Sequence, residues 1–169
     1  MSSEEERIRR MGHPTIEDLR AKGFIPTEER LAKGPVAIFE CVEPIPCNVC
    51  VFVCPFKAVK MDKITDLPTL DFERCTGCTV CVGRCPGQAI FVVDYSKPGD
   101  EGVLILQYDL ADPPSKGEKV VLMDREGKEL GYGEVILTYK EKETKANVVY
   151  VKAPKKYLMD ARAIRRVGD

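Results

Sequence analysis

The sequence lacks the residues on which most hydrolytic and acid–base active sites depend. It has one histidine and no tryptophan in 169 residues. His13 lies between Gly12 and Pro14, so we interpret it as a loop or cap residue, because a ligand or a base needs partner side chains. No glycine-rich phosphate loop follows an expected strand. The sequence therefore predicts no catalytic residues of its own.

Long apolar runs and an excess of one charge are also missing. No stretch approaches the ~20 apolar residues that span a bilayer, and the amino terminus lacks the basic-then-apolar order of a secretory signal. Lysine plus arginine (26) and aspartate plus glutamate (27) nearly cancel, which argues against a basic nucleic-acid surface. We expect a cytoplasmic protein with no membrane span and no nucleic-acid partner.

Amide side chains are scarce. Two asparagines and two glutamines stand against 31% charged residues. This balance is typical of heat-adapted proteins. The composition therefore indicates a thermophilic source and says nothing about activity.

Cysteine is the residue that the sequence uses in a pattern, with eight between residues 41 and 85 and none elsewhere. The second run is Cys75-Thr-Gly-Cys78-Thr-Val-Cys81-Val-Gly-Arg-Cys85-Pro86. It has the C-x-x-C-x-x-C-x-x-x-C-P spacing that holds cubane iron–sulfur clusters. Three closely spaced thiolates can surround one cubane, and the fourth ligates a neighbouring cluster. Four further cysteines are therefore required.

The first run supplies them, with one departure from the pattern. It reads Cys41-Val-Glu-Pro-Ile-Pro-Cys47-Asn-Val-Cys50-Val-Phe-Val-Cys54-Pro55. Pro44 stands where the pattern has its first cysteine, so Cys41 would reach the cluster from a loop three residues longer. Pro44 and Pro46 forbid a helix there and keep the loop extended. We predict Cys41 as the fourth ligand; a three-iron cluster or a ligand from elsewhere in the chain stays open.

Disulfides and a zinc ribbon are the two other uses that eight cysteines could have. Disulfides are typical of secreted proteins, whereas gaps of two and three residues favour metal binding. Two C-x-x-C pairs can also form a zinc ribbon, but a ribbon needs only four thiolates and leaves the two C-P tails unexplained. The spacing therefore favours iron–sulfur clusters over both.

Residues 36–96 resemble the bacterial-type ferredoxins that carry two 4Fe-4S clusters. The resemblance implies crossed ligation, in which each cluster takes three cysteines from one run and one from the other. One cluster would be held by Cys54, Cys75, Cys78 and Cys81. The other would be held by Cys41, Cys47, Cys50 and Cys85.

The surroundings of the two clusters differ in the sequence. Gly77 and Gly83 allow close backbone approach in the second loop, while the first carries the bulkier Val49, Phe52 and Val53. Hydrogen bonds to sulfur and exclusion of solvent tune cluster potentials. We expect two different potentials, and the sequence does not give the sign.

The expected fold is α+β: a ferredoxin-like two-cluster (βαβ)2 core with an N-terminal helical arm and a C-terminal small antiparallel β-barrel. Residues 1–35 read as a docking arm of three short helices, with a frayed tail as the alternative. Thr15 is followed three residues later by Asp18, as in a capping box, whereas Thr27 is followed by Arg30. The expected helices cover 3–11, 15–22 and 27–33.

The remaining elements follow from apolar runs and turn residues. Four strands are predicted in the cluster core, residues 36–100, and four in the barrel, residues 101–169. A break at 97–102 separates the two regions, and Pro154 begins a last helix that continues to about Arg166. The eight strands are predicted at 36–39, 58–61, 69–72, 89–93, 103–109, 119–123, 133–139 and 147–151.

The parts outside the core carry a wider resemblance. A free carrier needs only ~55 to 80 residues. The arm, the Cys41 spacing and the trailing barrel look like the ferredoxin-like small subunit of FAD-dependent amine, proline or sarcosine-type dehydrogenase complexes. This resemblance implies flavoprotein partner subunits, a hetero-oligomer, and a flavin only in a partner chain. The alternatives are a freely diffusing ferredoxin, and an iron–sulfur module that binds nucleic acid through the barrel.

Overall fold

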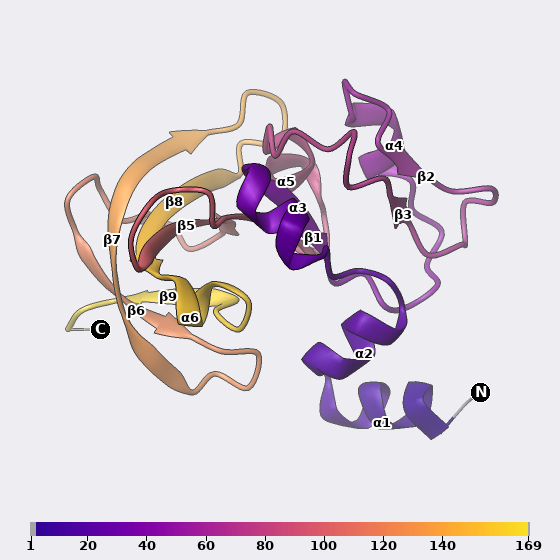
Figure 1. The fold of residues 1–169 in the computed structure, drawn as a ribbon, viewed down its shortest axis with the longest axis horizontal. Coiled ribbons are helices and arrows are strands. Elements are labelled where there is room, and N and C mark those ends of the chain that lie inside the picture. Colours follow the sequence, from indigo (N-terminus) through magenta and orange to yellow (C-terminus); the bar gives the residue numbers. More distant parts are fainter. Residues whose placement is uncertain (1–2, 169) are drawn as a thin grey trace.

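A computed structural model describes residues 3–168 as one large antiparallel sheet, a two-stranded ribbon and short helices (Figure 1). Residues 1, 2 and 169, at the ends of the expected arm and barrel, lie outside this range. The helices are α1 (Ser3–Met11), α2 (Ile16–Ala21), α3 (Glu28–Lys33), α4 (Val49–Val53), α5 (Val80–Arg84) and α6 (Lys155–Leu158). The strands are β1 (Val36–Phe39), β2 (Val59–Lys60), β3 (Thr69–Leu70), β4 (Ile90–Asp94), β5 (Glu101–Tyr108), β6 (Lys119–Met123), β7 (Glu129–Lys140), β8 (Asn147–Pro154) and β9 (Ala163–Arg166). The expected α+β class is confirmed.

One sheet joins the two regions that composition separates at 97–102. Its strand order is β1-β4-β5-β8-β7-β6-β9, and β2 pairs with β3 in the ribbon. Strand β4 pairs with β5 through Val92 and Ile105, so residues 95–100 form a hairpin connection. Among the described strands, β1 and β9 are the two ends of this order. The C-terminal region, predicted as a small antiparallel barrel, is a curled part of this one antiparallel sheet (Figure 1).

The central strands are buried on both faces, which explains why they read as continuous apolar runs. In β1, Val36 and Ile38 belong to a core enclosed by the curled sheet, together with Leu104 of β5 and Val151 of β8. Their neighbours Ala37 and Phe39 point to the opposite face. There they meet Leu19 and Phe24 of the N-terminal segment and several cysteines. The sheet thus separates an inner core from a face that supports the cysteine loops.

The N-terminal segment packs on its own chain. Leu19, Phe24 and Leu31 are buried in the two cores. The predicted capping box is confirmed, because Thr15 accepts from the Asp18 amide and the Asp18 carboxylate accepts from the Thr15 amide. The alternative of a frayed tail is therefore wrong for the described part of the segment. Helices as short as α2 and α3 depend on this packing.

The last helix is shorter than predicted. It ends at Leu158, and residues 163–166 form β9 along the edge of β6. The expectation of a helix to Arg166 is wrong because Arg162 must reach a buried carboxylate, which redirects the chain. The new strand also covers part of the β6 edge, which would otherwise expose unpaired backbone groups.

That carboxylate is Glu40, the residue before Cys41. Arg125 binds it through Nε and Nη2 at 3.0 and 2.6 Å, and Arg162 Nε donates to the same carboxylate. Burial opposes ionisation of Glu40, but the two guanidinium groups outweigh it and hold the pKa of this carboxyl below its usual value. The Arg162 guanidinium also lies 4.7 Å from the centre of the Phe91 ring. This triad fixes the start of the first cysteine loop.

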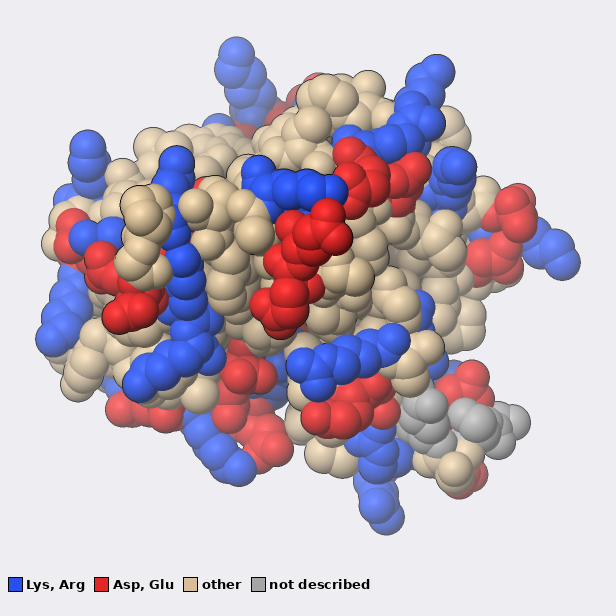
Figure 2. Space-filling model, viewed as in Figure 1, with Lys and Arg blue, Asp and Glu red and all other residues tan. Residues whose placement is uncertain are grey.

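The surface carries mixed charge. On the face in Figure 2, lysine and arginine side chains lie among aspartate and glutamate side chains, with uncharged areas between them. This agrees with the near-zero net charge of the sequence. Within residues 3–168, none of the helices combines the length and the apolar character that crossing a membrane requires.

Replacing Glu40 by glutamine should lower the free energy of unfolding by about 3–5 kcal/mol, because two buried guanidinium groups lose their shared anion. Denaturant titration followed by circular dichroism measures this loss. Glu126→Gln is the control, since Glu126 pairs with Lys128 on the surface and its removal should cost no more than about 1 kcal/mol. Equal losses for the two variants would contradict the role of the triad.

Candidate functional site

The strand pairing brings the two cysteine loops together. The first loop connects β1 to β2, and the second connects β3 to β4. Because β1 pairs with β4 and β2 pairs with β3, both loops lie over the same face of the sheet. Their helices α4 and α5 are in contact. Residues 30 positions apart in the sequence therefore become neighbours.

Each loop ends in the same cysteine-proline turn. Cys54 has φ −72° and ψ 107°, and Cys85 has φ −72° and ψ 114°, which is the extended conformation that a following proline imposes. In both turns the amide four residues on donates to the cysteine sulfur, from Ala58 at 3.3 Å and from Ala89 at 3.4 Å. The Cys-x-x-x-Cys-Pro spacing that the two runs share is thus matched by a shared backbone conformation. The extended residue ends the helix and turns its thiol away from it.

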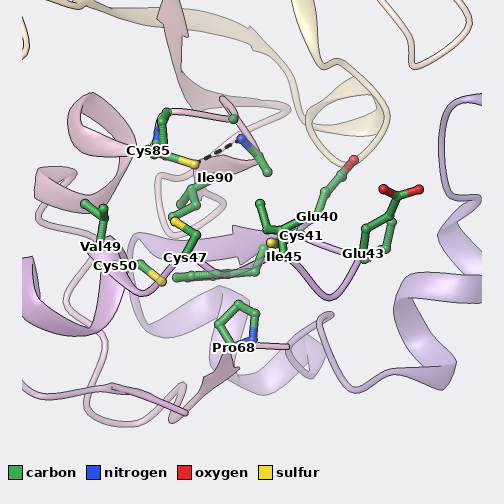
Figure 3. A pocket seen from close by; sticks show the side chains of 15 residues that line it. Glu40, Cys41, Glu43, Ile45, Cys47, Val49, Cys50, Pro68, Cys85 and Ile90 are labelled. Carbon is green, nitrogen blue, oxygen red and sulfur yellow. Dashed lines mark hydrogen bonds between the residues drawn. The ribbon is translucent and has the colours of Figure 1, made fainter. Parts of the chain in front are cut away.

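Four cysteines of mixed origin line one cavity. They are Cys41, Cys47 and Cys50 of the first loop and Cys85 of the second, around a cavity of about 220 Å³. Figure 3 shows their sulfur atoms directed toward a common space, with Ile45, Val49, Pro68 and Ile90 around them. The dashed line there marks the bond that the Cys85 sulfur accepts from the Ala89 amide. The longer loop therefore does bring Cys41 to the other three.

The other four cysteines line a second cavity. Here Cys54 of the first loop joins Cys75, Cys78 and Cys81 of the second. The cavity is smaller than the first, at about 20 Å³. Cys78 is exposed, so this side of the cavity faces solvent. The two sets match the crossed assignment that the resemblance implies.

The thiols raise one another's pKa within these sets. Burial, together with Cys85, Cys41 and Cys47, raises the pKa of Cys50 to about 11. Burial also raises the pKa of Cys81, with contributions from Cys75, Cys78, Cys54 and, last, Cys50. The Cys41 pKa is raised by burial and by Cys85 and Cys47. Buried thiols that repel one another's charge need a cationic centre to hold them as thiolates.

The donor set fits a cluster better than a single ion. Across residues 3–168, no three histidine, cysteine, aspartate or glutamate side chains gather closely enough to hold one metal ion. A cubane binds its four thiolates on four separate irons, so its ligands surround a body rather than a point. Sulfur-only donors, four to a cavity, are the ligand set of 4Fe-4S clusters. We therefore treat the two cavities as cluster sites.

Two segments outside the loops position the second cavity. Gly77 has φ +63°, and a Cβ there would lie 2.6 Å from the Pro35 Cβ, so the loop rests directly on the residue before β1. Arg30 of α3 donates to the carbonyl oxygens of Phe72 and Cys75, both at 2.6 Å, and to those of Gly34 and Pro35, both at 3.1 Å. A single guanidinium thus joins α3, the start of β1 and the Cys75 loop.

The C-terminal region contacts the same cavity through hydroxyl groups. The Thr79 hydroxyl lies 3.2 Å from the hydroxyls of both Tyr139 and Tyr150. Thr79 is buried and has φ +67°, a conformation that non-glycine residues rarely adopt. These bonds hold the turn between Cys78 and Cys81 against β7 and β8.

Sequence reasoning found the eight cysteines and missed these supports. A signal existed for Arg30, since it occupies the position where Thr27 would be followed by an acid in a capping box. In the structure Thr27 still accepts from the Arg30 amide at 3.2 Å, while the Arg30 side chain points to the cysteine loop. Thr79, Tyr139 and Tyr150 gave no signal, because their contact depends on the curl of the sheet.

Comparison with known proteins agrees with this geometry. Residues 40–89 match the family described as 4Fe-4S dicluster domain. The match supports a ferredoxin-type 4Fe-4S region. We refer to it below as the dicluster domain.

Curated relatives share only this part of the chain. The Hydrogenase-2 operon protein HybA of Escherichia coli O157:H7 is 40% identical over 58 residues, which cover 34% of this chain and 16% of HybA. HybA of Shigella flexneri gives the same values. An uncharacterized ABC transporter ATP-binding protein of Methanocaldococcus jannaschii is 28% identical over 76 residues, which cover 41% of this chain and 13% of that protein. The chain therefore spans about a sixth or less of these relatives. No solved structure matches.

Gly77→Ala should reduce the iron and sulfide content of the purified protein. The left-handed conformation costs an alanine about 1–2 kcal/mol, and the overlap with Pro35 adds to it by pushing the Cys75–Cys78 loop outward. Gly87→Ala is the matched control, because Gly87 follows Cys85 and Pro86 in the same loop and a Cβ there meets nothing within 4 Å. Iron and sulfide analysis of both variants checks this, and an equal content in the two would contradict it.

Proposed function

We propose that this protein carries two 4Fe-4S clusters and relays single electrons as a subunit of a multisubunit oxidoreductase. The observation that supports this most directly is the pair of adjacent cavities, each lined by four cysteines from both loops. Each cluster, when bound, takes up and releases one electron at a time. We assign Cys41, Cys47, Cys50 and Cys85 to one cluster. We assign Cys54, Cys75, Cys78 and Cys81 to the other.

The chain's own residues keep the two clusters close and oriented. Helix α4 carries Cys50, which faces the first cavity, and is followed by Cys54, which lines the second. Helix α5 carries Cys81 of the second cavity and is followed by Cys85 of the first. The two short helices therefore lie between the two clusters. Their contact with each other fixes the separation across which an electron passes.

We further propose that the partner is a flavoprotein dehydrogenase acting on amines or amino acids. The wider resemblance of the arm, the Cys41 spacing and the C-terminal region to small subunits of FAD-dependent complexes supports this assignment. Exposed large apolar side chains in the first cysteine loop and in the β2–β3 connection add support for a protein contact, with Phe52 79% exposed and Ile45 and Ile64 also exposed. The relative HybA is a hydrogenase-2 operon protein, which is also a redox context.

In this arrangement the flavin belongs to the partner chain. A flavin can accept two electrons from a carbon–nitrogen bond and release them singly, which matches a pair of one-electron centres. The near-neutral surface in Figure 2 fits a fixed subunit, since a diffusing carrier profits from a strong electrostatic field. The alternative is a freely diffusing ferredoxin, and the partner experiment below distinguishes the two.

Paired cysteine-to-serine changes should separate crossed from uncrossed ligation. Anaerobically reconstituted wild-type protein should contain about eight irons. Cys54→Ser with Cys75→Ser removes two ligands of one cluster and should leave about four irons. Cys75→Ser with Cys85→Ser removes one ligand from each cluster and should damage both. Iron analysis and electron paramagnetic resonance distinguish the pairs; the opposite result would show uncrossed ligation, and no iron in the wild type would end the proposal.

The partner should be found by anaerobic purification of the tagged chain from its native source. A stable complex with a flavin-containing chain, and bleaching of the cluster absorbance when an amine or amino-acid substrate is added, is the expected result. A monomer that several unrelated reductases reduce would instead support the diffusing carrier. Bleaching by dithionite but by no amine or amino acid would leave the cluster assignment standing and overturn the dehydrogenase partner.

A further inference from the structure

Arg30 is a buried cation that has no carboxylate partner among the described residues. It is 7% exposed, and its four side-chain hydrogen bonds all go to backbone carbonyl oxygens. No ion pair of Arg30 occurs within residues 3–168. Buried charges are otherwise paired, because removing a lone charge from water costs several kcal/mol. Arg30 therefore lacks a counter-ion within ion-pair distance among the described residues, and an anion bound beside it would supply one.

The buried cations near the first cavity are balanced in the ordinary way. Arg125 and Arg162 share Glu40, and Arg125 Nη1 also lies 3.5 Å from an Asp160 carboxylate oxygen. Two positive charges thus meet two negative charges. Glu43 adds a further carboxylate to the lining of this cavity. The first cavity consequently receives no net positive charge from these groups.

We infer that the cluster held by Cys54, Cys75, Cys78 and Cys81 is the counter-charge of Arg30, and that this pairing makes it the more easily reduced of the two. The inference rests on the two-cluster assignment proposed above. A 4Fe-4S cluster with four thiolates is an anion, and reduction adds one more negative charge. Arg30 donates at 2.6 Å to the carbonyl of Cys75, one of the four ligands, so its charge lies beside that cluster. A buried cation at this place stabilises the reduced state.

Hydrogen bonds to sulfur point in the same direction. The second set accepts two backbone N–H bonds, from Ala37 to Cys75 at 3.5 Å and from Ala58 to Cys54 at 3.3 Å. The first set accepts one among the described residues, from Ala89 to Cys85. Donors to sulfur raise a cluster's potential, whereas apolar residues line both cavities, among them Ile45 and Ile90 in the first and Phe39 and Val59 in the second. Charge and hydrogen-bond donors therefore agree on which cluster holds the first electron.

A redox titration followed by electron paramagnetic resonance tests this on the full chain. Arg30→Gln should lower the potential of one cluster by more than that of the other, and Cys78→Ser should alter the signal of that same cluster. Lys33→Gln is the matched control, because Lys33 is a cation on the same helix whose side chain is 51% exposed. It should leave both potentials unchanged, since solvent screens its charge. Arg30→Lys keeps the charge and loses the planar fork of donors.

The outcomes separate charge from structure and this inference from the proposed function. A selective fall in Arg30→Gln with a potential near that of the wild type in Arg30→Lys supports the inference. Equal shifts of both clusters, no shift, or a shift of the cluster that Cys78→Ser leaves unaltered would overturn it. If Arg30→Gln does not assemble clusters, Arg30→Lys decides: a wild-type potential supports the inference and a lowered one overturns it. Iron content near eight and two resonance signals in the wild type test the assignment itself.

Discussion

The pairing of β1 with β4 is the contact on which the cysteine chemistry depends. It closes the dicluster domain, because one cysteine loop leaves β1 and the other enters β4. Its register pairs Val36 with Val93 and Phe39 with Ile90. This register fixes the position of Cys41 relative to Cys85. Both strands are buried on both faces, so a slip of one residue would exchange the two apolar cores. Crossed ligation needs this fixed register, since each cavity takes its fourth cysteine from the other loop.

Local chemistry explains how much of the site the sequence could predict. The C-P tails impose an extended residue at Cys54 and Cys85 wherever they occur. Spacing and resemblance together then predicted that each of these two cysteines would join the three cysteines of the other loop. The strands at 36–39 and 119–123 were also predicted with the bounds that the structure has, because each is a continuous apolar run. Cys41 was predicted in spite of its displaced position, and the structure places it in the cavity with its three expected partners.

The parts that sequence reasoning missed depend on contacts between distant segments. Arg162 lies 122 residues from Glu40, and nothing near either of them in the chain indicates the pair. The helix expected to reach Arg166 was predicted from Pro154 and local propensity, which the buried ion pair and the open edge of β6 override. Whether the C-terminal strands form a barrel or an open sheet could not be predicted for a related reason, since closure depends on how the outer strands meet. Four strand candidates in a row are compatible with a barrel and with an open sheet alike.

The buried arginines also give the flanking segments a structural role within the chain, which is to place charges beside the two cavities. Arg30, Arg125 and Arg162 all lie outside the matched range of 40–89. A dicluster domain without the flanking segments would therefore contain Glu40 without its two cations, and the Cys75 carbonyl without Arg30. The C-terminal sheet neutralises a carboxylate beside the first cavity, and the N-terminal segment places a cation beside the second. Docking to a partner does not require either arrangement. The extensions therefore set the electrostatic surroundings of the two cavities separately, and a chain that shares the eight cysteines but not these arginines would hold its clusters at different relative potentials.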